Sequence, residues 1–246
     1  MELFLLIIKL LISAVICYML SAMIHELGHV ICGLLNHWKL FLLVVGPLKL
    51  YRENMKSRVK IGIEKNVVLW GGVGGTLPTN KSDDNIKTWS KILLSGPLAS
   101  IVFGLLIFPL FLLSKSIVLL MLSLMSVAMG VMCIIPMQMK TGLLYNDGTR
   151  YKRIKSGGQE EAEEKSLFLL MEKTLFDKDE CSYPEELIEP LLRSKDCELN
   201  YYGYYYSYCN AMKDNNVEQA AKQRSNMENI KSKVPRIIIQ DCKIED

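Results

Sequence analysis

Two stretches of this sequence carry no charged residue at all, residues 92–113 and residues 116–139. Each is longer than the roughly 20 residues that an α-helix needs to cross a bilayer. A third apolar stretch, residues 3–24, contains one charged residue, Lys9. Lipid cannot pair backbone polar groups, so such stretches must form helices that pair their own. We therefore expect three membrane-spanning helices, over residues 3–36, 92–113 and 116–136.

A cluster of ionisable residues lies inside the first apolar stretch, as His25-Glu26-Leu27-Gly28-His29. Helical residues four apart project from nearly the same face, so the two imidazoles can bind one zinc ion. Glu26 stands beside them and can take a proton from a zinc-bound water. Ionisable groups in a membrane helix are costly and by default mark a functional site. The alternative, a polar cluster that only holds helices together, is disfavoured by the motif and its setting.

Basic residues are distributed unevenly along the chain. Residues 1–155 hold 17 Lys+Arg and 7 Asp+Glu, whereas residues 156–246 hold 12 and 19. Fifteen of the 17 lie at 39–91 and 140–155, and only Lys115 lies between the second and third helices. The positive-inside rule then predicts a multi-pass protein of the cell membrane, with the N-terminus outside and the C-terminal part cytoplasmic. This explains the basic charge without nucleic acid, so we expect no nucleic-acid partner.

The seven cysteines show no C-x-x-C spacing, which argues against a structural zinc site built from them. Three of them, Cys17, Cys32 and Cys133, fall in the predicted membrane helices. The others fall in the predicted cytoplasmic part, where thiols stay reduced. We interpret all seven as small buried apolar residues.

Residues 40–79 do not have a helical period. Residues 48–52 and 58–63 alternate apolar and charged side chains, which is typical of strands. The short apolar runs 41–45 and 67–75 accompany them, and the second ends in glycines. We expect a small antiparallel sheet that is associated with the membrane, with its backbone groups paired or wet. It could offer an edge to an unwound substrate or be merely structural, and the sequence does not separate these.

A polar loop over residues 81–89 is expected before the second helix, which carries Gly96-Pro97-Leu98-Ala99 near its cytoplasmic start. Small residues allow close packing of helices in a membrane. Pro97 leaves one helical carbonyl without its partner, and that carbonyl could face the metal site or a substrate. A plain packing kink explains the proline equally well.

Zinc hydrolases usually hold the ion by three protein ligands and leave one position for water, so a carboxylate is expected beside the histidines. Apart from the motif glutamate, the acidic residues of the first 155 are Glu2, Glu53, Glu64, Asp83, Asp84 and Asp147. Asp147 follows the cytoplasmic end of the third helix, but residues 137–147 would have to fold back into the membrane. On spacing alone, Asn146-Asp147-Gly148 is an ordinary turn signal. His37, eight residues past His29, is interpreted as an interfacial residue rather than a ligand.

These motifs together resemble the site-2 protease family of intramembrane zinc metalloproteases, over about residues 10–150. The pentapeptide His25–His29 is similar to the family's H-E-x-x-H, including the glycine before the second histidine. Gly96-Pro97-Leu98-Ala99 resembles its G-P-hydrophobic-small segment, and Asp147-Gly148 resembles its Asp-Gly pair. The chain departs from the family at Ser100, where an asparagine is usual, and it lacks the usual Asn-Pro before Asp-Gly. No PDZ-type domain is visible, so it looks like a small bacterial-type member.

The resemblance implies that His25, His29 and Asp147 hold one zinc ion and that Glu26 is the catalytic general base. Candidates for positioning the substrate are Gly96, Pro97 and Asn146. The implied activity is hydrolysis of a peptide bond in or near a transmembrane segment. The substrate would be a membrane-anchored regulator, a signal-peptide remnant or a peptide precursor, met in the lipid bilayer. The alternative is a catalytically silent membrane scaffold that binds a peptide or partner through its tail, and the oligomeric state is not predicted.

Residues 156–246 are expected to form a separate cytoplasmic helical domain, after a protease core over residues 1–155. Helical patterns cover residues 159–176, 201–212 and 217–230, and the last two predict a single tetratricopeptide-like hairpin. The tyrosine-rich run 201–208 is interpreted as core packing, with a partner-binding face as the alternative. Residues 235–239 are expected as a closing strand or an extended end. The fold class is therefore a mainly α, polytopic membrane protein with three spanning helices and a small sheet.

Overall fold

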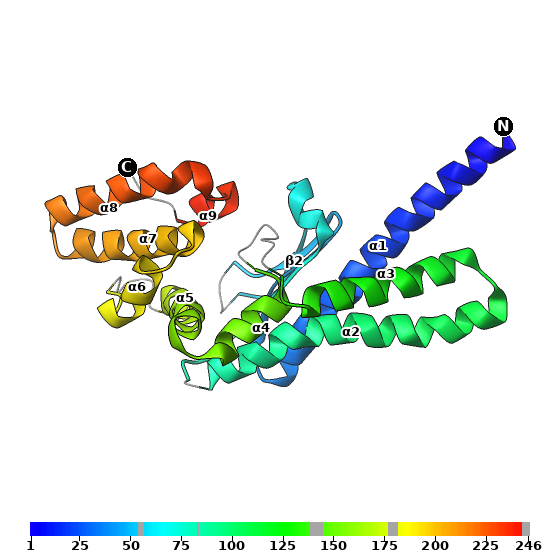
Figure 1. The fold of residues 1–246 in the computed structure, drawn as a ribbon, viewed down its shortest axis with the longest axis horizontal. Helices are drawn as coiled ribbons and strands as arrows, with labels where there is room; N and C mark the ends of the chain where they lie inside the picture. The colour runs from blue at the N-terminus through cyan, green and yellow to red at the C-terminus, as the bar shows by residue number, and fades with distance from the viewer. Residues whose placement is uncertain (54–56, 83, 138–144, 177–181, 243–246) are drawn as a thin grey trace. The chain divides into compact units, whose positions relative to one another are not determined.

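The chain divides by its internal contacts into two compact units, Met1–Pro136 and Met137–Asp246 (Figure 1). The computed structural model describes residues 1–53, 57–82, 84–137, 145–176 and 182–242. The expected boundary after residue 155 rests on composition, and that assignment of domains stays a prediction.

Three long helices dominate the first unit: α1 Glu2–Leu35, α2 Asn85–Ser114 and α3 Ile117–Ile134. All three are long and apolar enough to cross a membrane, which confirms the expected mainly helical class of a multi-pass membrane protein. The polar loop expected to reach residue 89 was wrong over its second half, because α2 begins at Asn85. Its polar first turn extends beyond the apolar stretch, where Lys87 Nζ lies 2.8 Å from Asp84 and Asn85 Nδ2 donates to the Asn80 carbonyl (2.9 Å).

The three helices pack through stripes of mostly small side chains, and the stripe on α1 also contains the two histidines. On α1 the buried residues at a spacing of four are Cys17, Ser21, His25, His29 and Gly33. Such residues share one face of a helix. Ser123 and Ser126 of α3 donate to the carbonyls of Gly104 (2.8 Å) and Ser100 (2.9 Å) on α2. Small side chains let the backbones approach closely, as is usual between membrane helices.

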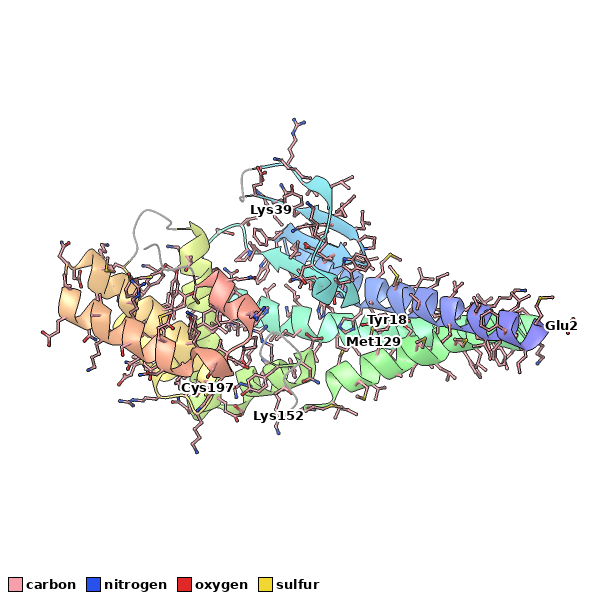
Figure 2. All side chains as sticks on the ribbon, turned by 90° about the horizontal axis from the view of Figure 1, so that it is seen from above. Glu2, Tyr18, Lys39, Met129, Lys152 and Cys197 are labelled. Carbon is pink, nitrogen blue, oxygen red and sulfur yellow. The ribbon has the colours of Figure 1, made fainter. Side chains whose placement is uncertain are left out.

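The N-terminal half of α1 has a different environment from its C-terminal half. Among the residues of α1, none before Cys17 is buried within the first unit. Figure 2 shows Glu2 at the tip of this half, with Lys39 following the other end of the helix. The apolar side chains of the N-terminal half suit contact with lipid, whereas the C-terminal half packs within the unit and carries both histidines.

The sheet of the first unit has four antiparallel strands in the order β3-β2-β1-β4. Their bounds are β1 Lys39–Val45, β2 Leu48–Tyr51, β3 Lys60–Ile63 and β4 Val73–Leu77. This confirms the expected small antiparallel sheet. The apolar run 67–75 was partly misjudged, because Val67–Gly71 form a 3₁₀ helix and the last strand starts only at Val73. Trp70 Nε1 donates to the Glu64 carbonyl (3.0 Å), which holds this helical turn in place of a longer strand.

The second unit is helical throughout its described part. Its helices are α4 Asp147–Ser156, α5 Gly158–Phe176, α6 Glu185–Leu192, α7 Cys197–Lys213, α8 Val217–Ile230 and α9 Arg236–Asp241, with a 3₁₀ turn at Lys231–Lys233. The expected helical hairpin is α7 and α8, joined through Asn215 at a φ of 54°. The strand or extended end expected at residues 235–239 was wrong: Pro235 caps α9, and Ile238 is fully buried on it.

The tyrosine-rich run belongs to the core of the second unit. Tyr201, Tyr202 and Tyr206 are buried together with leucines of α5 and α6, and Tyr204 and Tyr205 pack against the same core. Burial raises the pKa of Tyr206, as expected for a phenol removed from water. The structure thus confirms core packing as the role of most of this run.

Candidate metal centre

The two histidines of α1 meet through their outer ring nitrogens. His25 Nε2 lies 3.3 Å from His29 Nε2, and the rings stand edge to face with centroids 4.9 Å apart. Both side chains are buried, at 5% and 7% exposure. The spacing of four residues places them on one face of the helix, as the sequence predicts.

The inner nitrogens of both rings are held by α2. His29 Nδ1 lies 2.6 Å from the carbonyl oxygen of Ile92, which can only accept, so this nitrogen carries the proton. His25 Nδ1 lies 3.2 Å from the hydroxyl of Ser100, a fully buried residue. Metal-binding histidines are typically oriented by such a partner on the other ring nitrogen. The arrangement therefore directs the Nε2 lone pair of His29 toward His25.

A neutral His29 with its proton on Nδ1 presents only a lone pair at Nε2. Another nitrogen 3.3 Å away is favourable only if a proton or a cation lies between the two. Two Zn–N bonds of about 2.0–2.1 Å at a tetrahedral angle separate their nitrogens by about 3.3–3.4 Å. The observed separation therefore fits two ligands of one zinc ion.

Glu26 lies against the backbone of β4. A Cβ built on Gly74 would lie 2.7 Å from Glu26 Oε2, and one on Gly72 would lie 3.1 Å from Glu26 Oε1. Gly72 also has a φ of +110°, which disfavours any other residue. The glycines thus allow an edge strand of the sheet to run beside the carboxylate next to the histidine pair.

Gly96 and Pro97 lie where α2 approaches its neighbours. A Cβ on Gly96 would overlap the imidazole of His29, so this glycine lets α2 pack onto the ligand pair. Pro97 removes the N–H that would bind the Leu93 carbonyl, whereas the carbonyl that holds His29 is that of Ile92. The Ile92 carbonyl that holds His29 therefore comes one residue before the Leu93 carbonyl, which Pro97 leaves without a helical hydrogen-bond donor. Substrate positioning by Gly96 and Pro97 stays a prediction.

The acidic residues of the first unit differ in their availability as ligands. Three of them pair with lysines: Glu64 with Lys49 (2.8 Å), Glu53 with Lys60 (2.7 Å) and Asp84 with Lys87 (2.8 Å). The hydrogen bond from Lys49 also lowers the pKa of Glu64. Asp147 is the first residue of α4 in the second unit, and its role as third ligand stays a prediction. The stretch 138–144, expected to fold back, lies outside the described residues.

Asn146 and His37, two further residues weighed from the sequence, each lie at the end of a helix, and substrate positioning by Asn146 stays a prediction. Asn146 caps α4, and its Oδ1 accepts from the Thr149 amide (3.1 Å). His37 adopts a left-handed φ of 64° in the turn after α1, and Thr79 Oγ1 donates to its carbonyl (3.4 Å). Among the described residues, His37 is in no group of three metal-ligating side chains.

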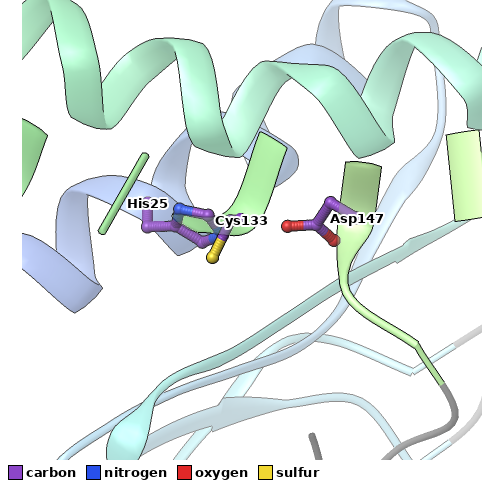
Figure 3. Close-up of side chains that lie close together, drawn as sticks. All are labelled: His25, Cys133 and Asp147. Atoms are coloured by element: carbon purple, nitrogen blue, oxygen red, sulfur yellow. The ribbon is translucent and has the colours of Figure 1, made fainter. Parts of the chain in front are cut away.

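Cys133 of α3 is a residue that the sequence did not single out. Its side chain lies beside that of His25 (Figure 3), and its sulfur is within 4.8 Å of a ring nitrogen of His25. Cys133 is half-buried, and no sequence spacing connects it to a residue 108 positions earlier. The sequence also gave no sign that Ser100 contacts His25 or that Gly74 of β4 lies against Glu26, because both approach the motif only through packing.

The start of α4 is tied to the core of the second unit. The Tyr145 hydroxyl lies 2.5 Å from Asp196, and the Arg153 guanidinium stacks 4.6 Å from the centre of the Tyr145 ring. Arg153 in turn pairs with Glu163 (2.5 Å) and with the fully buried Glu164 (3.0 Å). Burial, together with the bond to Asp196, raises the pKa of Tyr145, which therefore stays a donor. Tyr145, two residues before Asp147, is thus bonded to the core of its own unit.

A buried histidine pair with oriented rings and an adjacent glutamate, on an apolar helix, is the arrangement expected of a membrane metalloenzyme. The profile of Peptidase family M50 matches residues 13–239, and the chain belongs to this family, the zinc metalloproteases of the site-2 type. The resemblance noted from the sequence is thereby confirmed. Neither the curated proteins nor the solved structures gave a match.

Proposed function

We propose that this protein is an intramembrane zinc endopeptidase that cuts a peptide bond in or near a transmembrane segment. The observation that carries the proposal is the pair of Nε2 atoms 3.3 Å apart, with Glu26 as the next residue after His25. Because the pair lies on a helix apolar enough to span a bilayer, a substrate has to reach it within or beside the membrane.

His25 and His29 would hold a single zinc ion, with Asp147 as the third ligand. When bound, zinc polarises the scissile carbonyl and lowers the pKa of water toward about 7. Glu26 takes the proton of the attacking water and passes it to the leaving amine. The Ile92 carbonyl and the Ser100 hydroxyl hold the Nδ1 side of both rings, which would leave both Nε2 atoms to bind the ion.

Strand β4 would position the substrate. It pairs with β1 on one side and forms one edge of the sheet, so its other side can pair with an added strand. A helical substrate hides its peptide bonds and must unwind before cleavage, and an extended segment on β4 would lie beside Glu26. Substrates of this kind include a membrane-anchored regulator, a signal-peptide remnant or a peptide precursor.

The proposed orientation has the N-terminus outside and the second unit in the cytoplasm. It is supported by the basic residues at 39–91, which follow the histidine end of α1. If Lys39 marks the cytoplasmic surface, His29 lies on the order of 15 Å below it, at a rise of about 1.5 Å per residue. Cleavage would then occur on the cytoplasmic side of the bilayer centre.

The test is cleavage of model transmembrane peptides by the purified chain, by Glu26→Gln and by Glu2→Gln. Glu2 lies on the same helix but is exposed at its far end, so its variant is a matched control. The wild type and Glu2→Gln should cleave at the same rate, and Glu26→Gln should lose about 10²–10⁴-fold because the general base is gone. Cleavage by Glu26→Gln at the wild-type rate would refute the proposal. A zinc-loaded wild type that cuts no peptide would favour the scaffold alternative.

A further inference from the structure

The hydroxyl of Tyr18 lies on α1 beside the residues that lead into β4. A Cβ built on Gly71 would lie 3.1 Å from Tyr18 Oη, so this glycine leaves room for the hydroxyl. Tyr18 is 43% exposed and forms no hydrogen bond with any residue that the structure describes. We propose that the Tyr18 hydroxyl donates a hydrogen bond to a backbone carbonyl of the substrate, about three residues from the cleaved bond. This inference rests on the proposed function, in which an extended substrate pairs with β4.

Contacts between α1 and β4 follow one face of the helix. Tyr18, Ala22 and Glu26 are spaced four residues apart, so they share this face. A Cβ on Gly72 would lie 3.5 Å from the Ala22 Cβ. One on Gly74 would lie 2.7 Å from Glu26 Oε2. The chain from the end of the 3₁₀ helix through β4 therefore runs alongside this face, from Tyr18 past the catalytic carboxylate.

Helix and strand give a similar distance between Tyr18 and that carboxylate. Eight residues of α1 lead from Tyr18 to Glu26, which is about 12 Å at 1.5 Å per residue. Three residues lead from Gly71 to Gly74, which is at most about 10 Å at 3.3 Å per extended residue. A substrate strand on β4 with its cleaved bond beside Glu26 therefore reaches Tyr18 about three residues away, toward the N-terminal half of α1.

The hydroxyl stands where the hydrogen-bonding ladder of β4 ends. The strand begins at Val73, and the chain before it forms the 3₁₀ helix Val67–Gly71. A substrate backbone that continues past Val73 therefore has no further strand to pair with. Lipid cannot pair its carbonyls either, and an unpaired carbonyl in an apolar medium is costly. The Tyr18 hydroxyl supplies a donor at this point without placing a charge in the membrane.

The position of Tyr18 argues against the common role of tyrosine at a membrane surface. Aromatic belts mark the two ends of a spanning segment. Tyr18 lies midway along α1 (Figure 2), among the exposed apolar side chains of Val15, Ile16 and Leu20. A tyrosine hydroxyl in apolar surroundings usually has a hydrogen-bond partner. The described residues provide none, and the substrate is the partner that we assign.

The first test compares Tyr18→Phe with the wild type in cleavage of a transmembrane peptide by the full chain in detergent. Loss of a bond that is equally strong in the substrate complex and in the transition state raises KM and spares kcat. KM should therefore rise about 3- to 10-fold, with kcat within about twofold of the wild type. Tyr51→Phe is the matched control, because Tyr51 lies on β2, two strands from β4, and its KM should equal that of the wild type. A Tyr18→Phe variant with the wild-type KM, or with a loss in kcat alone, would overturn the inference.

A change in the substrate tests the bond itself. Replacing one backbone amide by an ester makes the carbonyl of that linkage a weaker acceptor, and single esters are placed two to four residues on either side of the cleaved bond. One of them should raise the wild-type KM by about threefold or more, whereas Tyr18→Phe should cleave the ester and amide peptides with equal KM. Esters that act equally on both enzymes, or on neither, contradict the proposed bond. A wild type that cuts none of the peptides would instead refute the proposed function, and this inference with it.

Discussion

Replacing Gly74 by alanine should disable the site without touching a metal ligand. The new Cβ would lie 2.7 Å from Glu26 Oε2 and 3.0 Å from the Glu26 carbonyl oxygen. Non-bonded heavy atoms are most favourable at about 3.5 Å or more, so the carboxylate or the strand has to move by about 0.8 Å. The neighbouring Gly75 is a matched control, because a Cβ there has nothing within 4 Å.

The expected loss follows from that displacement. A catalytic group misplaced by about 1 Å can cost on the order of 100-fold in rate, so we expect Gly74→Ala to cleave about 10- to 100-fold more slowly. That range corresponds to about 1.4–2.7 kcal/mol in activation free energy. Gly75→Ala should stay within about twofold of the wild type, since its added methyl group meets open space.

The assay is the initial rate of cleavage of a transmembrane peptide, measured together with zinc content for each variant. Zinc content should be unchanged in Gly74→Ala, because the new methyl group contacts Glu26 and not a histidine. Equal rates for Gly74→Ala and Gly75→Ala would show that β4 does not lie against the catalytic carboxylate. Loss of zinc from Gly74→Ala would show that the substitution acts through the fold instead.

Two further variants test the supports of the site and of the second unit. Ser100→Ala should weaken zinc binding by about 10–100-fold in chelator competition, because His25 loses its hydrogen-bond partner, whereas Ser123→Ala removes an equally buried hydroxyl and should change nothing. Arg153→Met should lower the free energy of unfolding by about 3–5 kcal/mol in thermal unfolding followed by circular dichroism, because the buried Glu163 loses its ion-pair partner and the buried Glu164 keeps only Arg150. Arg193→Met, which breaks only an exposed ion pair, should lower it by no more than about 1 kcal/mol, and an equal effect of both would contradict the burial argument.

The parts of the fold that the sequence predicted well depend on local physics. The uncharged stretches dictate spanning helices because lipid leaves no other partner for the backbone. The errors fall where tertiary contacts decide the outcome. Residues 85–89 form a polar start of α2 before its apolar stretch, where the Asn85 side chain donates to the Asn80 carbonyl. Residues 67–71 form a helical turn, in which Trp70 donates to the Glu64 carbonyl. At residues 235–239, burial of Ile238 against the core selects a helix over a strand.

The candidate site shows the same division between local and non-local information. His25, Glu26 and His29 were predictable because helical periodicity alone brings the two rings together. Ser100 lies 75 residues beyond His25, and only packing of α2 on α1 gives it a role. Cys133 and the glycines of β4 likewise reach the motif only through packing, and their residue types carry no signal of their own.

The most direct test of the account is the zinc content of the purified chain, determined by mass spectrometry of the metal and the protein together. The wild type and Glu26→Gln should each carry one zinc ion per chain, because the base is not a ligand. His29→Ala should carry little or none, because only His25 would remain of the pair whose nitrogens lie 3.3 Å apart. A wild type without zinc, or His29→Ala with a full complement, would contradict the claim that these two nitrogens share one ion.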